Sequence, residues 1–159
     1  MRPGGGWQTT LGMDLEGKTL GLLGLGNLGA RVGGIGAAMG MKLIAWSQSL
    51  TPEQARERGA ERVEKDELFR RSDVVSIHLI LSDRSRGLVG SRELGLMKPT
   101  ALLINTSRGP IINEAALLAA LREKRIRGFG ADTYDVEPLP NDHPLRSEPR
   151  AHWLSAGLR

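Results

Sequence analysis

The sequence of 159 residues contains no cysteine, few aromatic residues and no long apolar run. Without cysteine the protein has no disulfide bond, no catalytic thiolate and no cysteine-ligated zinc, and we expect no metal site. No segment approaches the roughly 20 consecutive apolar residues that a membrane-spanning helix needs. The amino terminus has no apolar stretch after Arg2, which argues against a secretory signal peptide. These absences favour a cytoplasmic protein that does not enter a membrane.

Positive charge is in mild excess, with a formal net charge of +4. Between Glu53 and Arg71 the basic residues alternate with acidic ones, which is typical of a solvated surface. The remaining basic residues are scattered, and aromatic residues, at 4% of the chain, offer few rings on which bases stack. We therefore do not expect a nucleic acid to be a partner.

The most informative stretch is Thr19–Arg31, where a short apolar run leads into closely spaced glycines and then into a helical pattern. The glycines follow the spacing Gly24-x-Gly26-x-x-Gly29. A strand, a glycine turn and a helix start in this order are the context that a dinucleotide-binding fingerprint requires. The alternative is a glycine-rich turn without a ligand. The agreement of strand, spacing and helix favours a cofactor, NAD or NADP.

Each residue of this turn has an expected role. Gly24 allows the tight turn, Gly26 lets the backbone approach a diphosphate without a Cβ atom in the way, and Gly29 lets helix and strand pack closely. The amides of Asn27 and Leu28 lie in the first helical turn, unpaired within the helix and directed at the phosphates.

From Thr19 onwards, segments typical of strands alternate with segments typical of helices. Further strands are expected at 41–46, near Val63, and at 73–81, 100–105 and 129–133. Helices are expected at about 27–39, from the capping box that begins at Thr51 to Gly59, at 66–71 and at 113–124. The runs at 73–81 and 100–105 are almost continuously apolar, as in strands buried on both faces of a parallel sheet. The pattern predicts an α/β fold of the Rossmann type, a doubly wound sheet of six strands in three αβα layers, with its ligand at the carboxyl ends of the strands.

Three further glycines, Gly33, Gly34 and Gly36, fall inside the first expected helix. Each costs up to about 1 kcal/mol relative to alanine. Close packing against the sheet is expected to explain one of them, and the sequence offers no reason for all three.

The second strand should end in an acidic residue that binds the adenosine ribose hydroxyls. This chain instead has Trp46-Ser47-Gln48-Ser49. The missing carboxylate removes the usual barrier to a 2′-phosphate, although no arginine is expected there to bind one. The choice between NAD and NADP therefore stays open.

Two later loops carry charged residues at expected strand ends. Arg108, in Asn105-Thr106-Ser107-Arg108-Gly109, suits bidentate capture of a substrate carboxylate, or else it hydrogen-bonds to loop carbonyls. The stretch from Asp132 to Glu137 contains three carboxylates, which either have a function in the site or are ordinary acidic residues of a loop. The local sequence leaves both alternatives open.

Together these motifs resemble the coenzyme domain of the D-isomer-specific 2-hydroxyacid dehydrogenases, which include glyoxylate/hydroxypyruvate reductases and phosphoglycerate dehydrogenases. The resemblance runs in register from about Leu15 to Pro149 through four stretches: LEGKTLGLLGLG, SDVVSIHL, MKPTALLINTSRG and DTYDVEPLPNDHPL.

The resemblance implies a hydride transfer between a nicotinamide cofactor and a 2-hydroxy or 2-keto acid. Arg108 would orient the substrate, Asp132 would hold the nicotinamide carboxamide, and Glu137 would keep a catalytic histidine protonated. Besides the glycine turn and Ser47, the implied cofactor contacts are His78, Leu79, Ser82, Thr106, Ser107, Arg108 and Asp132. Ile80 stands where the family usually has proline.

The chain departs from the family at its end. The family's histidine, in a Thr-Pro-His segment, would fall near Ala156, where this sequence has none. His152 is four positions early and is expected to face solvent, His143 to be structural, and His78 to pack or line the cofactor.

The expected organisation is a linker at 1–12, a dinucleotide-binding domain at 13–149 and a divergent tail at 150–159, without the family's substrate-binding domain. We expect a chain that binds the cofactor with little turnover. A non-catalytic module for cofactor binding or dimerisation, or a truncated pseudoenzyme, is the second hypothesis, and a reductase that uses His152 as its acid is the least favoured.

Overall fold

The computed structural model describes residues 12–153. Its strands, in chain order, are β1 (Thr19–Leu23), β2 (Lys42–Trp46), β3 (Glu61–Arg62), β4 (Val74–Ile77), β5 (Leu102–Asn105), β6 (Gly128–Ala131) and β7 (Ala151–Trp153). Its helices are α1 (Asn27–Ala38), α2 (Pro52–Glu57), α3 (Lys65–Arg71), α4 (Ser91–Leu96), α5 (Glu114–Arg122) and α6 (Pro144–Ser147), with one 3-10 turn, η1 (Gly109–Ile111). Within the described range, no helix is long and apolar enough to cross a bilayer.

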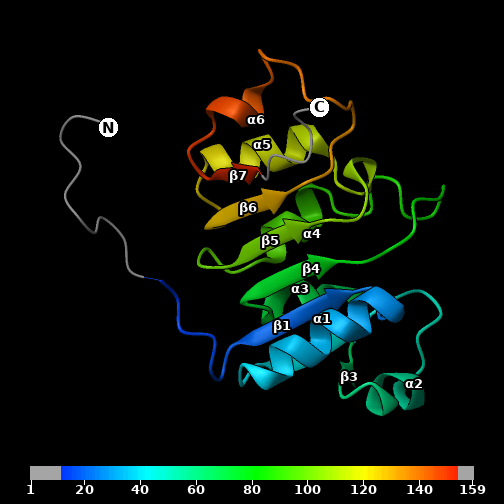
Figure 1. Cartoon of the computed structure of the whole chain (residues 1–159). Helices are drawn as coiled ribbons and strands as arrows, with labels where there is room; N and C mark the ends of the chain where they lie inside the picture. The colour runs from blue at the N-terminus through cyan, green and yellow to red at the C-terminus, as the bar shows by residue number, and fades with distance from the viewer. Residues whose placement is uncertain (1–11, 154–159) are drawn as a thin grey trace.

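All seven strands run parallel in one sheet, in the order β3-β2-β1-β4-β5-β6-β7 (Figure 1). The chain begins in the middle at β1, builds outwards to β3, and then returns beside β1 to build outwards to β7. The direction therefore reverses between β1 and β4, and open α/β sheets bind ligands at the carboxyl ends of the strands beside such a switch point. The expected doubly wound α/β fold is confirmed.

Helices cover the two faces of the sheet unequally. α1 packs against β1 and β2, and Figure 1 shows it in front of the sheet, with α3 and α4 behind. On that second face α3 contacts α4, and α4 contacts α5. The larger core cluster lies there and includes the wholly buried Phe69, Leu103 and Leu121. On the α1 face, Leu102 and Ile104 of β5 are only half-buried.

Two of the three unexplained glycines allow α1 to lie close to the sheet. A Cβ atom at Gly33 would come within 3.0 Å of Leu22 Cδ1, and one at Gly36 within 2.7 Å of Leu20 Cδ2. A Cβ atom at Gly34 would meet nothing within 4 Å. Packing therefore accounts for two of these glycines, one more than expected, and nothing in the structure explains Gly34.

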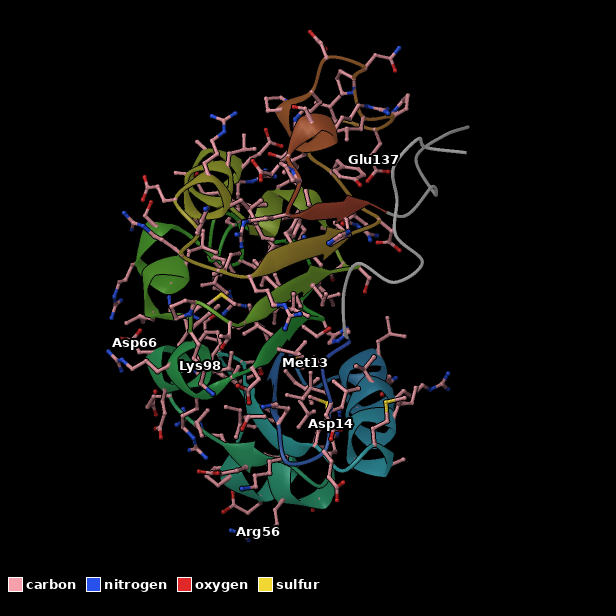
Figure 2. The ribbon with its side chains drawn as sticks, turned by 90° about the vertical axis from the view of Figure 1, so that its left-hand side faces the viewer. Met13, Asp14, Arg56, Asp66, Lys98 and Glu137 are labelled. Atoms are coloured by element: carbon pink, nitrogen blue, oxygen red, sulfur yellow. The ribbon has the colours of Figure 1, made fainter. Side chains whose placement is uncertain are left out.

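Ion pairs connect the helices at the sheet margin. Lys65 Nζ lies 2.8 Å from Glu93 Oε1, joining α3 to α4. Lys98 Nζ lies 2.8 Å from Asp73 Oδ1, and Asp73 Oδ2 accepts a hydrogen bond from the Thr19 amide. Burial raises the pKa of Asp73, but Lys98 and the amide outweigh it, so the pKa lies below its ordinary value. Figure 2 shows Lys98 well away from the labelled Glu137. The Lys98–Asp73 ion pair therefore stabilises the sheet margin and does not contact the loops at the carboxyl ends of the strands.

The structure contains two helices that were not expected, α4 and α6, and its strands differ from the expected ones in two places. The sheet has a seventh strand, because Ala151–Trp153 pairs with β6 inside the segment that we expected to be a divergent tail. The expectation of six strands is thus wrong by one. The strand expected at 73–81 ends at Ile77, so the residues beyond it form a loop. Most of the expected linker, residues 1–11, and the position near Ala156 lie outside the described residues.

Candidate functional site

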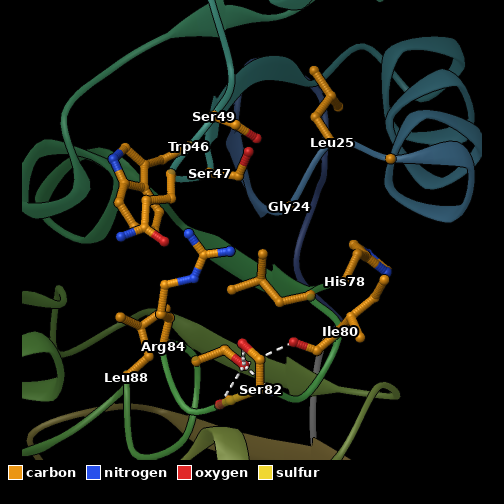
Figure 3. A pocket seen from close by; sticks show the side chains of 14 residues that line it. Gly24, Leu25, Trp46, Ser47, Ser49, His78, Ile80, Ser82, Arg84 and Leu88 are labelled. Atoms are coloured by element: carbon orange, nitrogen blue, oxygen red, sulfur yellow. Dashed lines mark hydrogen bonds between the residues drawn. The ribbon is translucent and has the colours of Figure 1, made fainter.

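A hollow of about 340 Å³ lies at the carboxyl ends of β1, β2 and β4, beside the switch point (Figure 3). Its volume is in the range typical of small-molecule sites. We call it the switch-point hollow. Its lining includes six of the expected cofactor-binding residues: Gly24, Gly26, Ser47, His78, Leu79 and Ser82. It also includes residues that the sequence analysis did not select: Leu25, Trp46, Gln48, Ser49, Ile80, Arg84, Ser85 and Leu88.

Gly24 forms the sharp corner between β1 and α1. Its φ of 102° lies in the left-handed region that L side chains rarely adopt. A Cβ atom there would also come within 2.8 Å of the His78 backbone. The Gly24 amide donates to the Trp46 carbonyl at 2.9 Å, so the corner is fastened to β2 as well. Both the conformation and the space therefore require glycine.

Gly29 and Gly26 differ in their surroundings. A Cβ atom at Gly29 would come within 2.2 Å of the Gly24 carbonyl oxygen, so the first turn of α1 lies directly against the corner. A Cβ atom at Gly26 would meet nothing within 4 Å, which leaves open space above the backbone. Within residues 12–153, the amides of Asn27 and Leu28 have no hydrogen-bond acceptor. Open space beside unpaired helix N-terminal amides fits a diphosphate.

The loop after β4 is held in shape by serine hydroxyls. Ser85 Oγ donates to the Ile80 carbonyl at 2.7 Å and accepts from the Ser82 amide at 2.8 Å. Ile80, where the family usually has proline, is 87% exposed at the hollow. The loop therefore presents an apolar side chain and serine hydroxyl groups to the hollow.

His78 lies at the start of this loop and lines the hollow. Its Nε2 lies 2.9 Å from Ser76 Oγ. Burial lowers the pKa of the His78 imidazole. A neutral, hydrogen-bonded ring agrees with the expectation that His78 packs or lines the cofactor.

Arg108 follows β5 in a loop fixed by side-chain hydrogen bonds. Asn105 Nδ2 donates to the Arg108 carbonyl at 2.9 Å, and Asn105 Oδ1 accepts from the Ser107 amide at 3.1 Å. Ser107 Oγ donates to the Leu79 carbonyl at 2.6 Å, which ties this loop to the one after β4. The exposed Arg108 guanidinium donates one bond, to the Ser107 carbonyl. Its remaining donors face solvent, so both expected roles are compatible with this geometry.

The loop after β6 adjoins that loop. A Cβ atom at Gly109 would come within 2.2 Å of the Tyr134 carbonyl carbon, so the two backbones touch. Glu137 Oε1 accepts a hydrogen bond from the Tyr134 amide at 3.0 Å. Burial, reinforced by the charges of Asp132 and Glu137, raises the pKa of Tyr134. The loops that carry Arg108 and Glu137 are therefore neighbours at one edge of the sheet.

Asp132, at the end of β6, has an unusual oxygen. Its Oδ1 is buried without a hydrogen-bond partner in residues 12–153, as is the neighbouring Thr133 Oγ1. A buried polar atom without a partner costs free energy, roughly 1–3 kcal/mol. A carboxamide N–H would satisfy this oxygen, which fits the role expected for Asp132 toward nicotinamide.

The other two histidines lie elsewhere. His143 caps α6, where its Nδ1 accepts from the Leu145 amide and its Nε2 lies 3.1 Å from Glu114 Oε1. His152 is exposed on β7, in register with Gly130 of β6. His143 is therefore structural, as expected, and His152 faces solvent, as expected, although it belongs to a strand.

The expected residues thus form two groups. The glycine corner, Ser47 and the loop after β4 surround the switch-point hollow, whereas Thr106, Ser107, Arg108, Asp132 and Glu137 lie at the ends of β5 and β6. The Ser107–Leu79 hydrogen bond joins the groups. Asn27, Leu28 and Gly29 lie just outside the hollow, in the first turn of α1. The contribution of Arg84 was missed because nothing in the local sequence links this loop to the end of β2.

Comparisons with known proteins agree with this geometry. Residues 2–154 match the family model described as D-isomer specific 2-hydroxyacid dehydrogenase, NAD binding domain. A glyoxylate reductase of Aeropyrum pernix is 49% identical over 142 residues, which are 88% of this chain and 42% of that protein. A putative D-3-phosphoglycerate dehydrogenase from Ralstonia solanacearum has a TM-score of 0.87 at 36% identity, covering 92% of this chain and 43% of that one.

A D-isomer-specific 2-hydroxyacid dehydrogenase from Lactobacillus delbrueckii, solved with NAD bound, has a TM-score of 0.78 at 30% identity, covering 88% of this chain and 46% of that one. The chain thus spans less than half the length of these relatives. The family model covers nearly the whole chain, including the glycine corner and β7. The chain therefore belongs to the D-isomer-specific 2-hydroxyacid dehydrogenase family and corresponds to its NAD-binding domain.

Proposed function

We propose that this chain binds a nicotinamide dinucleotide with its diphosphate over Gly26, as part of a reductase of 2-keto acids. The observation that supports this best is the corner itself, where open space at Gly26 meets unpaired amides at the start of α1. The adenosine would lie in the switch-point hollow, and the nicotinamide would lie toward Asp132. The bound nicotinamide supplies the hydride.

The residues at the ends of β5 and β6 act on the substrate and on the cofactor's nicotinamide end. Asp132 accepts a carboxamide N–H through its unpartnered buried oxygen and so fixes the orientation of the ring. Arg108 offers exposed guanidinium donors to a substrate carboxylate, whose two oxygens match the planar fork. Glu137 keeps one carboxylate oxygen for a proton-donating imidazole, because only its Oε1 is used by Tyr134 among the described residues.

We expect little turnover from the 159 residues alone. The chain has three histidines, and none hydrogen-bonds Glu137. His78 bonds Ser76, His143 lies beside Glu114, and His152 is exposed on β7. No proton donor of the kind that Glu137 would support is therefore in place.

Isothermal calorimetry with NADH and with NADPH tests the proposed binding. We expect saturable binding of at least one dinucleotide, weakened tenfold or more in Gly26→Ala, because its Cβ atom would enter the space of the diphosphate. Gly34→Ala is the matched control, since its Cβ atom is equally free of contacts but lies far along α1. Absence of any binding, or equal binding by Gly26→Ala and wild type, contradicts the proposal.

Turnover is tested separately by mixing the chain with glyoxylate and reduced cofactor and following the nicotinamide absorbance. We expect no oxidation above the protein-free rate. Activity that His152→Ala abolishes would instead support the least favoured hypothesis, with His152 as the acid.

We also propose a cytoplasmic protein that pairs with a second copy through α1. The cysteine-free composition supports the compartment. Support for pairing comes from Ile35 of α1 and Met39 at its C-cap, which are 60% and 53% exposed. Sedimentation should detect a dimer that Ile35→Glu weakens and that Val136→Glu, at an exposed loop position, leaves intact. A wild-type monomer at every concentration tested contradicts pairing.

A further inference from the structure

We propose that Arg84 binds the 2′-phosphate of NADP and so makes this domain select NADP over NAD. The inference rests on the proposed dinucleotide site and goes beyond it, because the end of β2 alone left the choice of cofactor open.

The switch-point hollow contains no carboxylate. No Asp or Glu is among the residues that line it, so nothing there can accept both ribose hydroxyls as an acidic residue at the end of β2 would. The same absence removes the repulsion that a carboxylate would exert on a 2′-phosphate. Arg84 is the one permanently charged residue in the lining, so the hollow favours an anion.

The Arg84 guanidinium is free to bind a ligand. Within residues 12–153 it has no ion pair and no side-chain hydrogen bond, and the residue is exposed. Figure 3 shows it reaching across the hollow from the loop after β4 toward Trp46 and Ser47. The loop is braced beneath it, because Ser85 Oγ holds the Ile80 carbonyl and the Ser82 amide. The hydrogen-bonded loop therefore holds the Arg84 guanidinium toward the position expected for the adenosine ribose.

The end of β2 supplies neutral donors on the opposite side. Ser47, Gln48 and Ser49 all line the hollow, and hydroxyl and amide groups donate to phosphate oxygens. An adjoining hollow behind Ser47 and Ser49 contains Arg58 and Glu57. Arg58 Nη1 donates to the Leu25 carbonyl, so part of its guanidinium is already engaged. Arg84 is therefore the cation in the lining of the switch-point hollow, and its guanidinium has no hydrogen-bond partner among residues 12–153.

The two cofactors differ in charge at the position that Arg84 would contact. NADP differs from NAD by a phosphate monoester, which carries roughly −1.5 to −2 charges near neutral pH. A guanidinium binds such a group through parallel charge-assisted hydrogen bonds, which NAD cannot form because it lacks the 2′-phosphate. Loss of a hydrogen bond to a charged group corresponds to roughly a 10- to 100-fold change in affinity.

The test compares binding of NADPH and NADH, with 2′,5′-ADP and 5′-AMP as fragments that contain only the adenosine end. Calorimetry is done on wild type, Arg84→Ser and Arg86→Ser, the last being an exposed arginine of the same loop that does not line the hollow. Melting temperatures verify that all three proteins are folded. The wild type should bind NADPH at least tenfold tighter than NADH, and 2′,5′-ADP tighter than 5′-AMP.

Arg84→Ser should lose at least tenfold in affinity for NADPH and 2′,5′-ADP, with less than a twofold change for NADH, and Arg86→Ser should change neither. The wild-type preference should also shrink as salt is added, since an exposed charge pair is screened. Equal affinities of the wild type for both cofactors, or an equal loss of both in Arg84→Ser, overturns the inference and leaves the proposed function standing. Failure of both dinucleotides to bind refutes the inference together with the proposed function.

Discussion

Alanine substitutions along α1 provide a direct test of how this helix meets the glycine corner. Gly29→Ala and Gly34→Ala make the same chemical change in one helix, and each gains up to about 1 kcal/mol of helix propensity. They differ in what the new methyl group meets. At Gly34 it meets nothing within 4 Å, whereas at Gly29 it comes within 2.2 Å of the Gly24 carbonyl oxygen.

The clash at Gly29 cannot be relieved by rotating a side chain. Cβ atoms essentially never lie within 3.0 Å of another heavy atom, so the corner or the helix must retreat by most of an ångström. Overpacking of this kind costs about 1–3 kcal/mol. The two variants share the propensity gain, so the difference between their unfolding free energies isolates the clash. Gly34→Ala should be more stable than wild type by up to about 1 kcal/mol.

Urea denaturation measures this difference. With a slope near 2 kcal/mol per molar urea, typical for small proteins, the two midpoints should lie about 0.5–1.5 M apart. Gly36→Ala should fall between them, because its obstacle is the movable end of Leu20 and not a backbone. Equal midpoints for Gly29→Ala and Gly34→Ala, or a destabilised Gly34→Ala, would refute the reasoning.

Three other predictions concern single side chains. Burial lowers the pKa of His78 below its ordinary value of 6.5. The free energy of unfolding should therefore be highest above pH 6.5 and should fall as the pH drops through the pKa of the folded protein. Urea titrations near neutral pH and in mild acid should show that His78→Gln loses less unfolding free energy on acidification than wild type does. Lys65→Met leaves the buried Glu93 unpaired and should cost about 1–3 kcal/mol near neutral pH. Because Lys65 lowers the pKa of Glu93 against the effect of burial, this penalty should fade in acid as Glu93 protonates, and a pH-independent penalty would argue against the pairing. Asp132→Ala should keep or raise the melting temperature while weakening NADH binding about tenfold in calorimetry; a lower melting temperature with unchanged affinity would contradict its proposed role.

The sequence predicts those parts of the fold that local rules determine. Thr51 Oγ1 accepts from the Gln54 amide and Gln54 Oε1 from the Thr51 amide, as the capping box requires. Asn113 Oδ1 caps α5 through the Ala116 amide. Gly59 has a positive φ of 74° just past α2, where a helix end was expected. These signals involve residues within a few positions of one another, so reading them needs no knowledge of the tertiary structure.

The missed elements either are short or depend on contacts that are remote in the sequence. β7 has only three residues with no alternating pattern, and its identity as a strand comes from pairing with β6. α4 was missed because six residues are too few to show helical periodicity, although Glu93 accepts from the Gly90 amide at its start. The role proposed for Arg84 needs the loop after β4 to lie beside Ser47, which only the switch of strand order brings about.

The hydrogen bond from Ser107 to the Leu79 carbonyl has a consequence for energetic coupling between the two ends of the cofactor. It joins the loop that carries Arg108 to the loop after β4, which would flank adenosine in the proposed site, so displacing one loop would strain this bond to the other. If binding of a substrate acid at Arg108 raises the affinity for the dinucleotide by some factor, thermodynamic reciprocity requires the dinucleotide to raise the affinity for the acid by the same factor. Ser107→Ala should reduce that mutual factor toward one, as measured by calorimetry of each ligand with and without the other.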